Sequence, residues 1–267
     1  MLPVVVEREK RVGAAVIQGN VGWPGRLWII RHGESAGNIA RDRAEASGAP
    51  LIDLKHRDAD VPLSPLGLEQ SQALGAWARA LPEQDRPTTF MASPYKRARE
   101  TAEAVAGAMG RASEDVVVDE RLREKEFGVL DRYTRAGIRA KFPELAEQRQ
   151  LVGKFYFRPP GGESWCDVVL RLRSMLGDLQ RNHAGERVMI VAHQVIVNCF
   201  RYLLERMDEG TILAIDRNGD VPNCGITEYV EAPDGCGLVL KRTNFVAPLV
   251  EAGSPVTIES DRPKGAR

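Results

Sequence analysis

The sequence predicts an α/β domain of the three-layer α/β/α kind, built on a mostly parallel central sheet. Short apolar runs rich in β-branched residues alternate along the chain with longer stretches of helical periodicity. Because a helix between two strands normally makes those strands parallel, this alternation favours a parallel sheet covered on both faces. The 267 residues suffice for one substantial core, and no repeat or linker divides the middle of the sequence.

Four apolar runs are predicted to form strands of this sheet. The last of them is the longest and most apolar, which predicts a position in the middle of the sheet. Two later runs, residues 225–230 and 237–242, are separated by Ala232-Pro-Asp-Gly235 and predict a hairpin. The four predicted strands are residues 27–31, 88–92, 116–118 and 187–193.

Four amphipathic stretches are predicted to form the helices that cover the sheet. The first has Ser64 at its cap and Pro65 at its first helical position, which are the residue types that these positions favour. The fourth starts directly after the strand that ends at His193. The first three are expected over residues 64–81, 94–109 and 164–183.

The two ends of the chain show no clear period. Residues 1–26 close with Gly22-Trp23-Pro24-Gly25 and are interpreted as an N-terminal extension. Residues 248–267 are rich in Pro, Gly and charged side chains and are interpreted as a flexible C-terminal tail. The sequence therefore predicts a single domain over residues 27–247.

The amino-acid composition indicates which kinds of binding partner and which cell compartment to expect. Lysine plus arginine (37) balances aspartate plus glutamate (37), so no overall field attracts nucleic acid or an anionic membrane. Four widely spaced cysteines predict free thiols rather than a disulfide framework. The N-terminus lacks the residue order of a signal peptide, and no apolar run reaches membrane-spanning length. We expect a cytoplasmic protein without nucleic-acid or membrane partners, and leave its oligomeric state open, a homodimer included.

The first predicted strand ends in Arg31-His32-Gly33, a candidate site for an anion. Open α/β sheets bind their ligands at the carboxyl ends of strands, and a glycine after the histidine lets the backbone turn and a bulky anion approach. Ser35 and Asn38 can donate hydrogen bonds from the segment that follows. From this tripeptide alone, a catalytic role and a purely structural role are equally well supported.

Two more strand ends carry polar candidates. Arg97 follows the second strand on the first helical turn, where backbone donors and a planar guanidinium can bind phosphoryl oxygens together, although a solvated basic helix face explains it equally well. His193 ends the fourth strand, where a lone histidine is more often structural. Two histidines and two arginines at like-facing strand ends nevertheless suit phosphoryl transfer by a nucleophilic imidazole. Glu124 and Glu126, just past the third strand, are the candidates for the proton donor, although a solvated surface carboxylate explains either residue equally well.

Together these segments resemble the histidine phosphatase superfamily, the phosphoglycerate mutase-like proteins, over roughly residues 27 to 245. The resemblance is carried by three blocks in the family's order: Arg31-His32-Gly33-Glu34-Ser35 with Asn38, Leu63-Ser64-Pro65-Leu66-Gly67 with Gln70, and Ser93-Pro94 with Arg97, Ala98, Thr101 and Ala102. It implies the phosphoglycerate mutase-like fold, with His32 as phosphate-accepting nucleophile, Arg31, Arg97 and His193 as phosphate clamp, and Glu124 as proton donor.

Within that superfamily, Gly162-Glu163-Ser164 and the pair His193-Gln194 are most similar to the fructose-2,6-bisphosphatase type of domain. That similarity implies that residues 154–158 form a basic, aromatic loop that binds the substrate. An amphipathic connector explains the same five residues equally well. Asn198 stands where that domain has a sugar-phosphate-binding arginine, which counts against the same substrate. The predicted substrate-binding residues are Ser35, Asn38, Gln194, Lys154, Arg158 and Asn198, with Asn223 as a further candidate.

The resulting hypothesis is a phosphatase that hydrolyses a small phosphomonoester, a phosphosugar or a phosphorylated acid, without metal or cofactor. A 2,3-bisphosphoglycerate-dependent phosphoglycerate mutase ranks second, because the interval from Glu124 to Glu163 is short for a mutase of this superfamily. A non-catalytic module that binds phosphorylated ligands is the alternative of another class, and the retained candidates count against it. Metal catalysis is a weaker rival, since the histidines show no ligand spacing.

Overall fold

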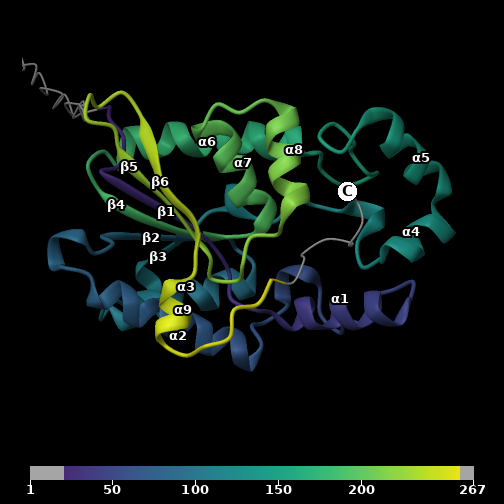
Figure 1. The fold of residues 1–267 in the computed structure, drawn as a ribbon, viewed down its shortest axis with the longest axis horizontal. Helices are drawn as coiled ribbons and strands as arrows, with labels where there is room; N and C mark the ends of the chain where they lie inside the picture. The colour runs from purple at the N-terminus through teal and green to yellow at the C-terminus, as the bar shows by residue number, and fades with distance from the viewer. Residues whose placement is uncertain (1–20, 259–267) are drawn as a thin grey trace, which may run out of the picture.

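A six-stranded sheet between two layers of helices forms the body of the protein in the computed structural model, which describes residues 21–258 (Figure 1). The strand order is β3-β2-β4-β1-β5-β6. The first four strands in this order pair in parallel, and β5 and β6 pair antiparallel, which confirms the predicted fold class. The strands are β1 (Arg26–Arg31), β2 (Thr89–Ala92), β3 (Val116–Val118), β4 (Arg187–Ala192), β5 (Ile226–Glu231) and β6 (Leu238–Phe245).

Both faces of the sheet are buried, as the apolar runs predict. In β1, Leu27 and Ile29 join one core, whereas Trp28 and Ile30 join the other, because successive side chains of a strand point to opposite faces. The first core lies between the sheet and α6 (Trp165–Asn182), α7 (Gln194–Leu204) and α8 (Glu209–Asn218), above the sheet in Figure 1. The second lies between the sheet and α2 (Pro65–Ala80), α3 (Lys96–Ala108) and α9 (Ala247–Glu251), below the sheet. β4 is buried on both faces and lies inside the sheet, as predicted.

The four predicted helices are present with boundaries within about two residues of those expected. Ser64 caps the first of them, since its hydroxyl accepts a hydrogen bond from the Gly67 amide at 3.0 Å. Ser164 caps the third in the same way through the Asp167 amide. These helices are α2 (Pro65–Ala80), α3 (Lys96–Ala108), α6 (Trp165–Asn182) and α7 (Gln194–Leu204).

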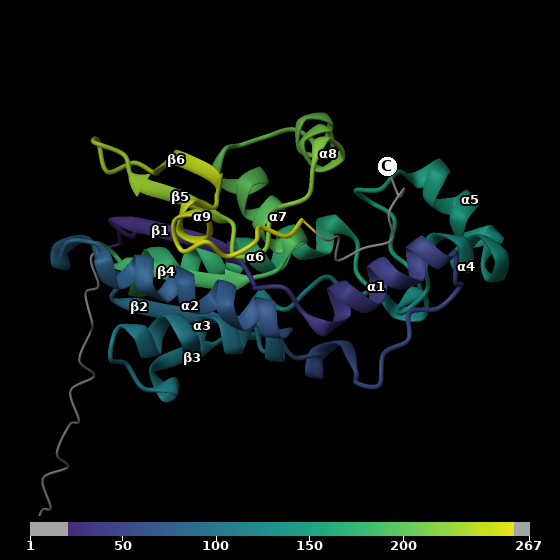
Figure 2. The ribbon, with the colours of Figure 1, turned by 60° about the horizontal axis from the view of Figure 1, so that its bottom comes forward.

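Five further α-helices of the described residues lie outside the set predicted from the sequence, the short α9 among them, and three of them extend past the carboxyl edge of the parallel strands. α1 (Ala36–Ser47) leaves this edge beside α4 (Arg135–Lys141) and α5 (Pro143–Val152), as the two ribbon views agree (Figures 1 and 2). Thr134, the cap of α4, donates from its hydroxyl to the carbonyl of Ala49 at 2.6 Å, which ties the two parts together. The fourth is α8 (Glu209–Asn218).

The segment interpreted as a flexible tail packs against the domain over its first part. Helix α9 (Ala247–Glu251) fully buries Leu249, and the Gln70 side chain donates to the carbonyl of Pro255 at 3.0 Å. The packed part of the chain therefore continues past residue 248, where the tail was expected to begin. A helix as short as α9 shows no hydrophobic periodicity in the sequence, so its buried contacts could not be predicted. Residues 259–267 and residues 1–20 of the predicted extension lie outside the described residues.

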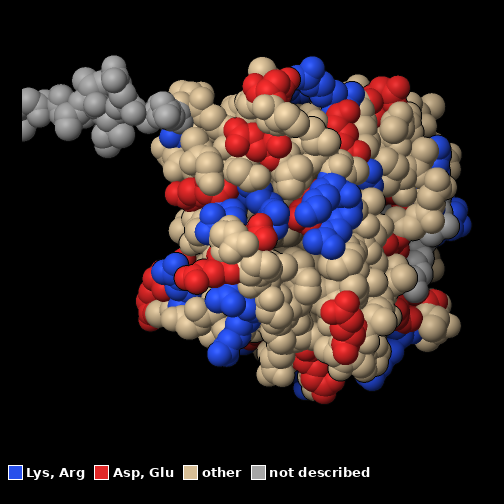
Figure 3. All heavy atoms as spheres, turned by 60° about the vertical axis from the view of Figure 1, so that its left-hand side comes forward, with Lys and Arg blue, Asp and Glu red and all other residues tan. Residues whose placement is uncertain are grey.

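Charges of both signs are mixed over the face shown in Figure 3, as expected for a chain whose charges balance. The four cysteines are free thiols, with Cys199 and Cys224 buried and Cys236 exposed. Over residues 21–258, no helix combines the length and the apolar character that crossing a membrane requires.

Candidate active site

The carboxyl ends of β2, β4 and β1 meet at one edge of the sheet because the register of the three strands is flush. Arg31 pairs with Ala192, and Ala92 pairs with Val191. The residue after each strand continues this pattern: the His32 amide donates to the Ala192 carbonyl at 3.0 Å. The rings of His32 and His193 consequently lie edge to face with their centroids 5.1 Å apart. The sequence-predicted histidines thus form one site.

His32 is fully buried, and its backbone surroundings fix which ring nitrogen is basic. Its Nδ1 lies 2.7 Å from the carbonyl oxygen of Gly33. Since a carbonyl oxygen only accepts, Nδ1 carries the ring proton and Nε2 keeps its lone pair. That lone pair accepts a hydrogen bond from Nε of Arg97 at 3.2 Å. Nε2 is therefore the basic ring nitrogen, and it faces a guanidinium.

Two glycines let the backbone after His32 pack closely against helix α2. A Cβ on Gly33 would lie 2.6 Å from the Gly67 carbonyl oxygen, and a Cβ on Gly67 would lie 1.9 Å from the Glu34 carbonyl oxygen. The Gly33 amide donates to the Thr101 hydroxyl at 3.0 Å. Any larger residue at either glycine would push the backbone that carries His32 away from α2.

Arg97, on the first turn of α3, is held by an aspartate that the sequence reasoning missed. Its Nη1 donates to the carbonyl of Asp58 at 2.7 Å and to Oδ1 of the same residue at 3.0 Å. The guanidinium also stacks on the Tyr95 ring, with its central carbon 5.0 Å from the centroid. Asp58 lies in a short 3-10 helix, Asp58–Asp60, within a stretch of no clear period, so no local signal marks it.

Arg31 is the other predicted arginine of the clamp, and it is buried beside the same strand end. Its Nη1 donates to the carbonyl of Val221 at 2.6 Å. Asn223, two residues further, donates from its side chain to the His32 carbonyl at 3.1 Å. The loop before β5 therefore positions both members of the Arg31-His32 pair from the side opposite α3.

His193 is positioned by the loop that follows β2. Its Nε2 lies 2.7 Å from the hydroxyl of Ser93, and its ring lies edge to face with Tyr95 at 5.1 Å between centroids. Tyr95 in turn donates from its hydroxyl to Glu126 at 3.0 Å. Burial raises the pKa of Tyr95 well above its usual value, so this phenol stays neutral and serves as a donor.

The structure distinguishes the two candidate proton donors that the sequence left open. The Glu124 side chain is buried, and its Oε1 accepts a hydrogen bond from the Lys125 amide at 2.7 Å. Glu126 has a side chain 45% exposed and bonds to Tyr95. A buried carboxyl is the better candidate for a general acid, because desolvation favours its protonated form. The geometry thus favours Glu124.

The loop that carries Glu124 is braced by a pair that the sequence reasoning did not assign. Nη2 of Arg171, on α6, donates to the backbone carbonyls of Arg123 at 2.8 Å and Glu124 at 3.3 Å. Glu163 binds the same guanidinium, with Nε of Arg171 at 3.0 Å from its Oε1, and accepts from the Glu126 amide at 3.1 Å. The Glu163 seen in the sequence as part of a motif therefore positions the acid loop.

Ser35 and Asn38, two of the predicted substrate-binding residues, form the cap of helix α1. The Ser35 hydroxyl accepts from the Asn38 amide at 3.1 Å, and the Asn38 carboxamide oxygen accepts from the Ser35 amide at 3.0 Å. Both side chains are buried at the start of the segment that follows His32. Their reciprocal bonds fix the direction in which α1 leaves the site.

The other four predicted substrate-binding residues separate into two groups. Gln194 and Asn198, on α7, are buried. Gln194 donates to Asp220, two residues after the end of α8, at 2.5 Å, and Asn198 donates to Asp216 within α8 at 3.4 Å. Lys154 also pairs with Asp216, through Nζ. Arg158 is different: its side chain is 62% exposed and pairs with Asp167 at the start of α6. The structure does not bring Arg158 to the others.

The assembled groups suit attack on a phosphorus centre. A basic imidazole nitrogen faces a guanidinium, and a second imidazole lies beside it. A second buried arginine, Arg31, directly precedes the first histidine, and the buried carboxyl of Glu124 follows strand β3. Cationic groups of this kind stabilise the charge on phosphoryl oxygens. Within residues 21–258, no three His, Cys, Asp or Glu side chains are grouped so as to hold a metal ion.

Comparisons with known proteins agree with this chemistry. The model of the histidine phosphatase superfamily (branch 1) matches residues 27–244. The chain is 30% identical over 202 residues to a 2,3-bisphosphoglycerate-dependent phosphoglycerate mutase of Sinorhizobium fredii, covering 74% of this chain and 88% of that protein. It is 29% identical to a phosphoglycerate mutase-like protein of Arabidopsis thaliana, covering 75% of this chain and 72% of that one.

Solved structures share the fold. A mycobacterial glucosyl-3-phosphoglycerate phosphatase superimposes with a TM-score of 0.63 at 24% identity, over 82% of this chain and 98% of that one. A putative alpha-ribazole-5'-P phosphatase from Escherichia coli superimposes with a TM-score of 0.67 at 20% identity, over 84% of this chain and 97% of that one. At these identities the likeness concerns the arrangement of the elements.

Proposed function

The chain belongs to the histidine phosphatase superfamily, and from this we propose that it is a phosphatase that hydrolyses a small phosphomonoester through a phosphohistidine on His32. The observation that carries the proposal is the basic Nε2 of His32 facing the guanidinium of Arg97 at 3.2 Å. A phosphoryl group on that nitrogen would meet the guanidinium directly. Members of the superfamily include phosphatases and mutases, so phosphoryl transfer or hydrolysis is the shared chemistry.

The proposed reaction has two steps. In the first, the Nε2 lone pair of His32 attacks phosphorus, the bond to the ester oxygen breaks, and the Glu124 carboxyl gives its proton to that oxygen. In the second, the Glu124 carboxylate takes a proton from water, the water oxygen attacks the phosphohistidine, and the N–P bond breaks to release phosphate. Together the two steps restore the starting state of Glu124 and His32.

Arg31, Arg97 and His193 would bind the phosphoryl oxygens through both steps. They come from three elements that meet at one edge of the sheet, so they surround the phosphorus from different sides. Their role is electrostatic, because the charge on the equatorial oxygens has to be neutralised for a histidine to attack. No metal or cofactor takes part in this scheme.

A phosphoglycerate mutase is the second candidate, supported by the relative from Sinorhizobium fredii that carries this name. A mutase must return the phosphoryl group to its substrate, which requires exclusion of water from the phosphohistidine. The segment between Glu124 and Glu163, which holds α4 and α5, is shorter than that of mutases of the superfamily and favours hydrolysis. Phosphate release from 3-phosphoglycerate should therefore outpace its isomerisation. Much faster isomerisation would overturn the phosphatase proposal.

The remaining alternative is a module that binds phosphorylated ligands without chemistry. Against it stands the retention of His32, Arg97, Glu124 and His193, of which His32 contacts both Arg97 and His193. Activity on a chromogenic phosphomonoester, measured with His32→Ala as control, separates the two. We expect activity that persists in excess chelator and that disappears in the variant. Equal rates in both proteins would exclude the mechanism.

We also propose that the substrate is a phosphosugar or a phosphorylated acid and that the protein works in the cytoplasm, where the free thiols of the chain would stay reduced. A screen of phosphate release over phosphosugars, phosphoglycerates, nucleotides and phosphopeptides tests the substrate class. Preference for phosphopeptides would contradict it.

A further inference from the structure

A cavity of about 340 Å³ lies beneath the helices that extend past the sheet edge, and it is lined by cations and apolar side chains. Its walls come from α4, α5, the connector after α5, and α8. Among the residues described by the structure, none of those that line it is acidic. The cationic members are Arg135, Arg139, Arg149, Lys154 and Arg217, and the large apolar members are Leu130, Ile138, Leu145, Phe157 and Leu213.

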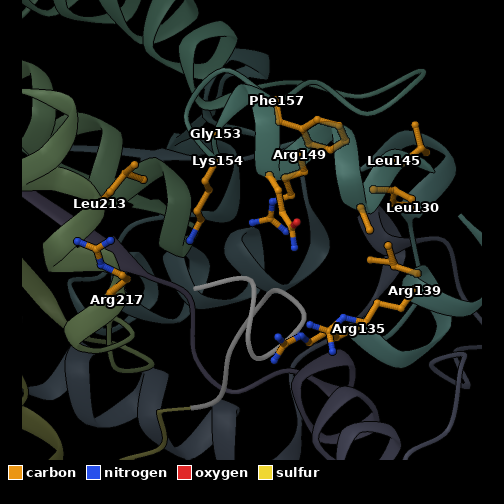
Figure 4. A pocket seen from close by; sticks show the side chains of 13 residues that line it. Leu130, Arg135, Arg139, Leu145, Arg149, Gly153, Lys154, Phe157, Leu213 and Arg217 are labelled. Atoms are coloured by element: carbon orange, nitrogen blue, oxygen red, sulfur yellow. The ribbon is translucent and has the colours of Figure 1, made fainter. Parts of the chain in front are cut away.

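The cations reach this cavity from opposite walls. Figure 4 shows Lys154 and Arg149 extending into it from one side and Arg135 from the other, with Phe157 and Leu130 along the wall. Arg135 and Arg139 are one helical turn apart on α4, so they present their charges on the same face. Such a like-charged pair destabilises a short helix slightly. The arrangement is therefore better suited to binding an anion than to stabilising the fold.

Three of these arginines have charges that no acidic side chain among residues 21–258 neutralises. Across the described part of the chain, Arg135, Arg139 and Arg217 make no side-chain hydrogen bond or ion pair. Lys154, by contrast, is fixed by its pair with Asp216. Guanidinium groups converging on one hollow repel one another, and the planar fork of each matches a carboxylate or phosphate. In a chain whose charges balance overall, this local excess indicates an anionic ligand.

A second, smaller cavity adjoins this one on the side of the candidate active site. It shares Leu130, Ile138, Arg149, Lys154 and Phe157 with the first. Its other walls include Lys125, directly after Glu124, and Val195, two residues after His193. The two cavities together therefore extend from the sequence neighbours of Glu124 and His193 to the arginines.

We propose that the substrate carries a second anionic group, joined to the scissile phosphate through an apolar body, and that the arginine-lined cavity binds this group. The apolar walls contact the body, and Arg135, Arg139 and Arg217 bind the distal carboxylate or phosphate. This inference rests on the proposed phosphatase function, whose substrate it narrows to doubly anionic esters.

The test compares matched esters. A series of n-alkyl phosphates is assayed for phosphate release against ω-carboxyalkyl phosphates of the same chain lengths. For at least one length, the carboxylated ester should be preferred by about tenfold or more in kcat/KM, mainly through a lower KM, since charge-assisted hydrogen bonds of this kind are strong. Hydrolysis of both series without preference at any length would overturn the inference and leave the phosphatase proposal standing. Hydrolysis of neither series would overturn both.

Variants then assign the preference to the cavity. Arg139→Gln and Arg217→Gln should each lower the preference for the carboxylated ester about tenfold, and Arg139→Lys should retain part of it because the charge remains. Arg79→Gln is the matched control, since Arg79 is an exposed arginine in the last turn of α2. An equal loss on both ester series in the Arg139 and Arg217 variants would indicate a structural role for the cavity and overturn the inference. Thermal unfolding of each variant identifies such a loss.

Discussion

The Nε of Arg97 lies 3.2 Å from Nε2 of His32, while Nδ1 of the same imidazole lies 2.7 Å from the Gly33 carbonyl oxygen. These two contacts decide the tautomer of the imidazole. A ring proton on Nδ1 leaves Nε2 as the basic nitrogen, which is the atom that attacks phosphorus in the proposed mechanism.

The first prediction concerns the intermediate. Incubation with a chromogenic phosphomonoester, followed by a quench at neutral or alkaline pH, should leave a phosphate on His32. Acid must be avoided because it hydrolyses phosphohistidine. Mass spectrometry of the digested protein locates it. His32→Ala should carry no phosphate and lose at least about 10³-fold in kcat. A phosphate on any other residue of the active protein would contradict the assignment.

The second concerns Asp58, which binds the Arg97 guanidinium through its carboxylate and its backbone carbonyl. Asp58→Asn weakens the charged part of this bond, so Arg97 loses its fixed position beside His32. We expect kcat/KM to fall between about tenfold and a hundredfold, as is usual for a misplaced catalytic group. Asp60→Asn, in the same short helix, is the control, because Asp60 pairs only with Arg57 among the described residues. Similar losses in both variants would show that the helix, and not the ion pair, matters.

The third concerns Glu124 as proton donor. Glu124→Gln should lower kcat/KM for an alkyl phosphate by about 10² to 10⁴-fold, because the alkoxide leaves only when protonated. The loss for 4-nitrophenyl phosphate should be much smaller, since nitrophenolate leaves without a proton. Glu126→Gln provides the comparison within the same loop, and it should affect both esters alike. Equal losses of the two esters in Glu124→Gln would remove the general acid from the mechanism.

The fourth concerns Lys125, which is buried beside Glu124 and stacks over the Phe127 ring. Burial lowers the pKa of Lys125 from 10.5 to about 8. Below about pH 8 the folded protein therefore keeps Lys125 protonated, and the desolvation of this buried charge lowers the free energy of unfolding. Between pH 8 and 10.5 Lys125 is protonated in the unfolded chain and mostly neutral in the folded protein. The contribution of this residue to stability accordingly rises with pH across that window.

Lys125→Met should therefore be more stable than the parent protein at neutral pH, by on the order of 2 kcal/mol, and this advantage should shrink as the pH approaches 10. Urea unfolding at several pH values measures the difference. Lys55→Met, at an exposed position, is the control and should show no such trend. An advantage that stays constant with pH would mean that the Lys125 side chain is not desolvated.

Much of the fold and the catalytic set follows from local patterns in the sequence. The apolar runs gave the strands and their burial, the Ser64-Pro65 and Ser164 caps gave two helix starts, and the polar residues after each strand indicated the edge where ligands bind. These features depend on neighbours in sequence, which is why they can be read without the fold. The tail was harder to interpret, because the buried Leu249 of α9 stands in a helix too short to show a period.

The roles that escaped prediction are those defined by long-range contacts. Asp58 meets Arg97, Ser93 meets His193, and Arg171 meets the Glu124 loop only because strands and helices from distant parts of the chain pack together. Each is an ordinary polar residue in its own segment. The contrast between Lys154 in the cavity and Arg158 in a surface ion pair is likewise invisible in the sequence.

The sequence by itself determined the strands of the sheet, four of the helices that cover it and the residues that carry the candidate chemistry, because periodicity, caps and strand ends are local properties. Only the tertiary structure decided which nitrogen of His32 faces Arg97, which carboxyl near the site is buried, and which cations share a cavity. All three properties depend on strand register and on the packing of α4, α5 and α8. A shift of a few ångströms in that packing decides whether a charged side chain lines a cavity or lies in solvent.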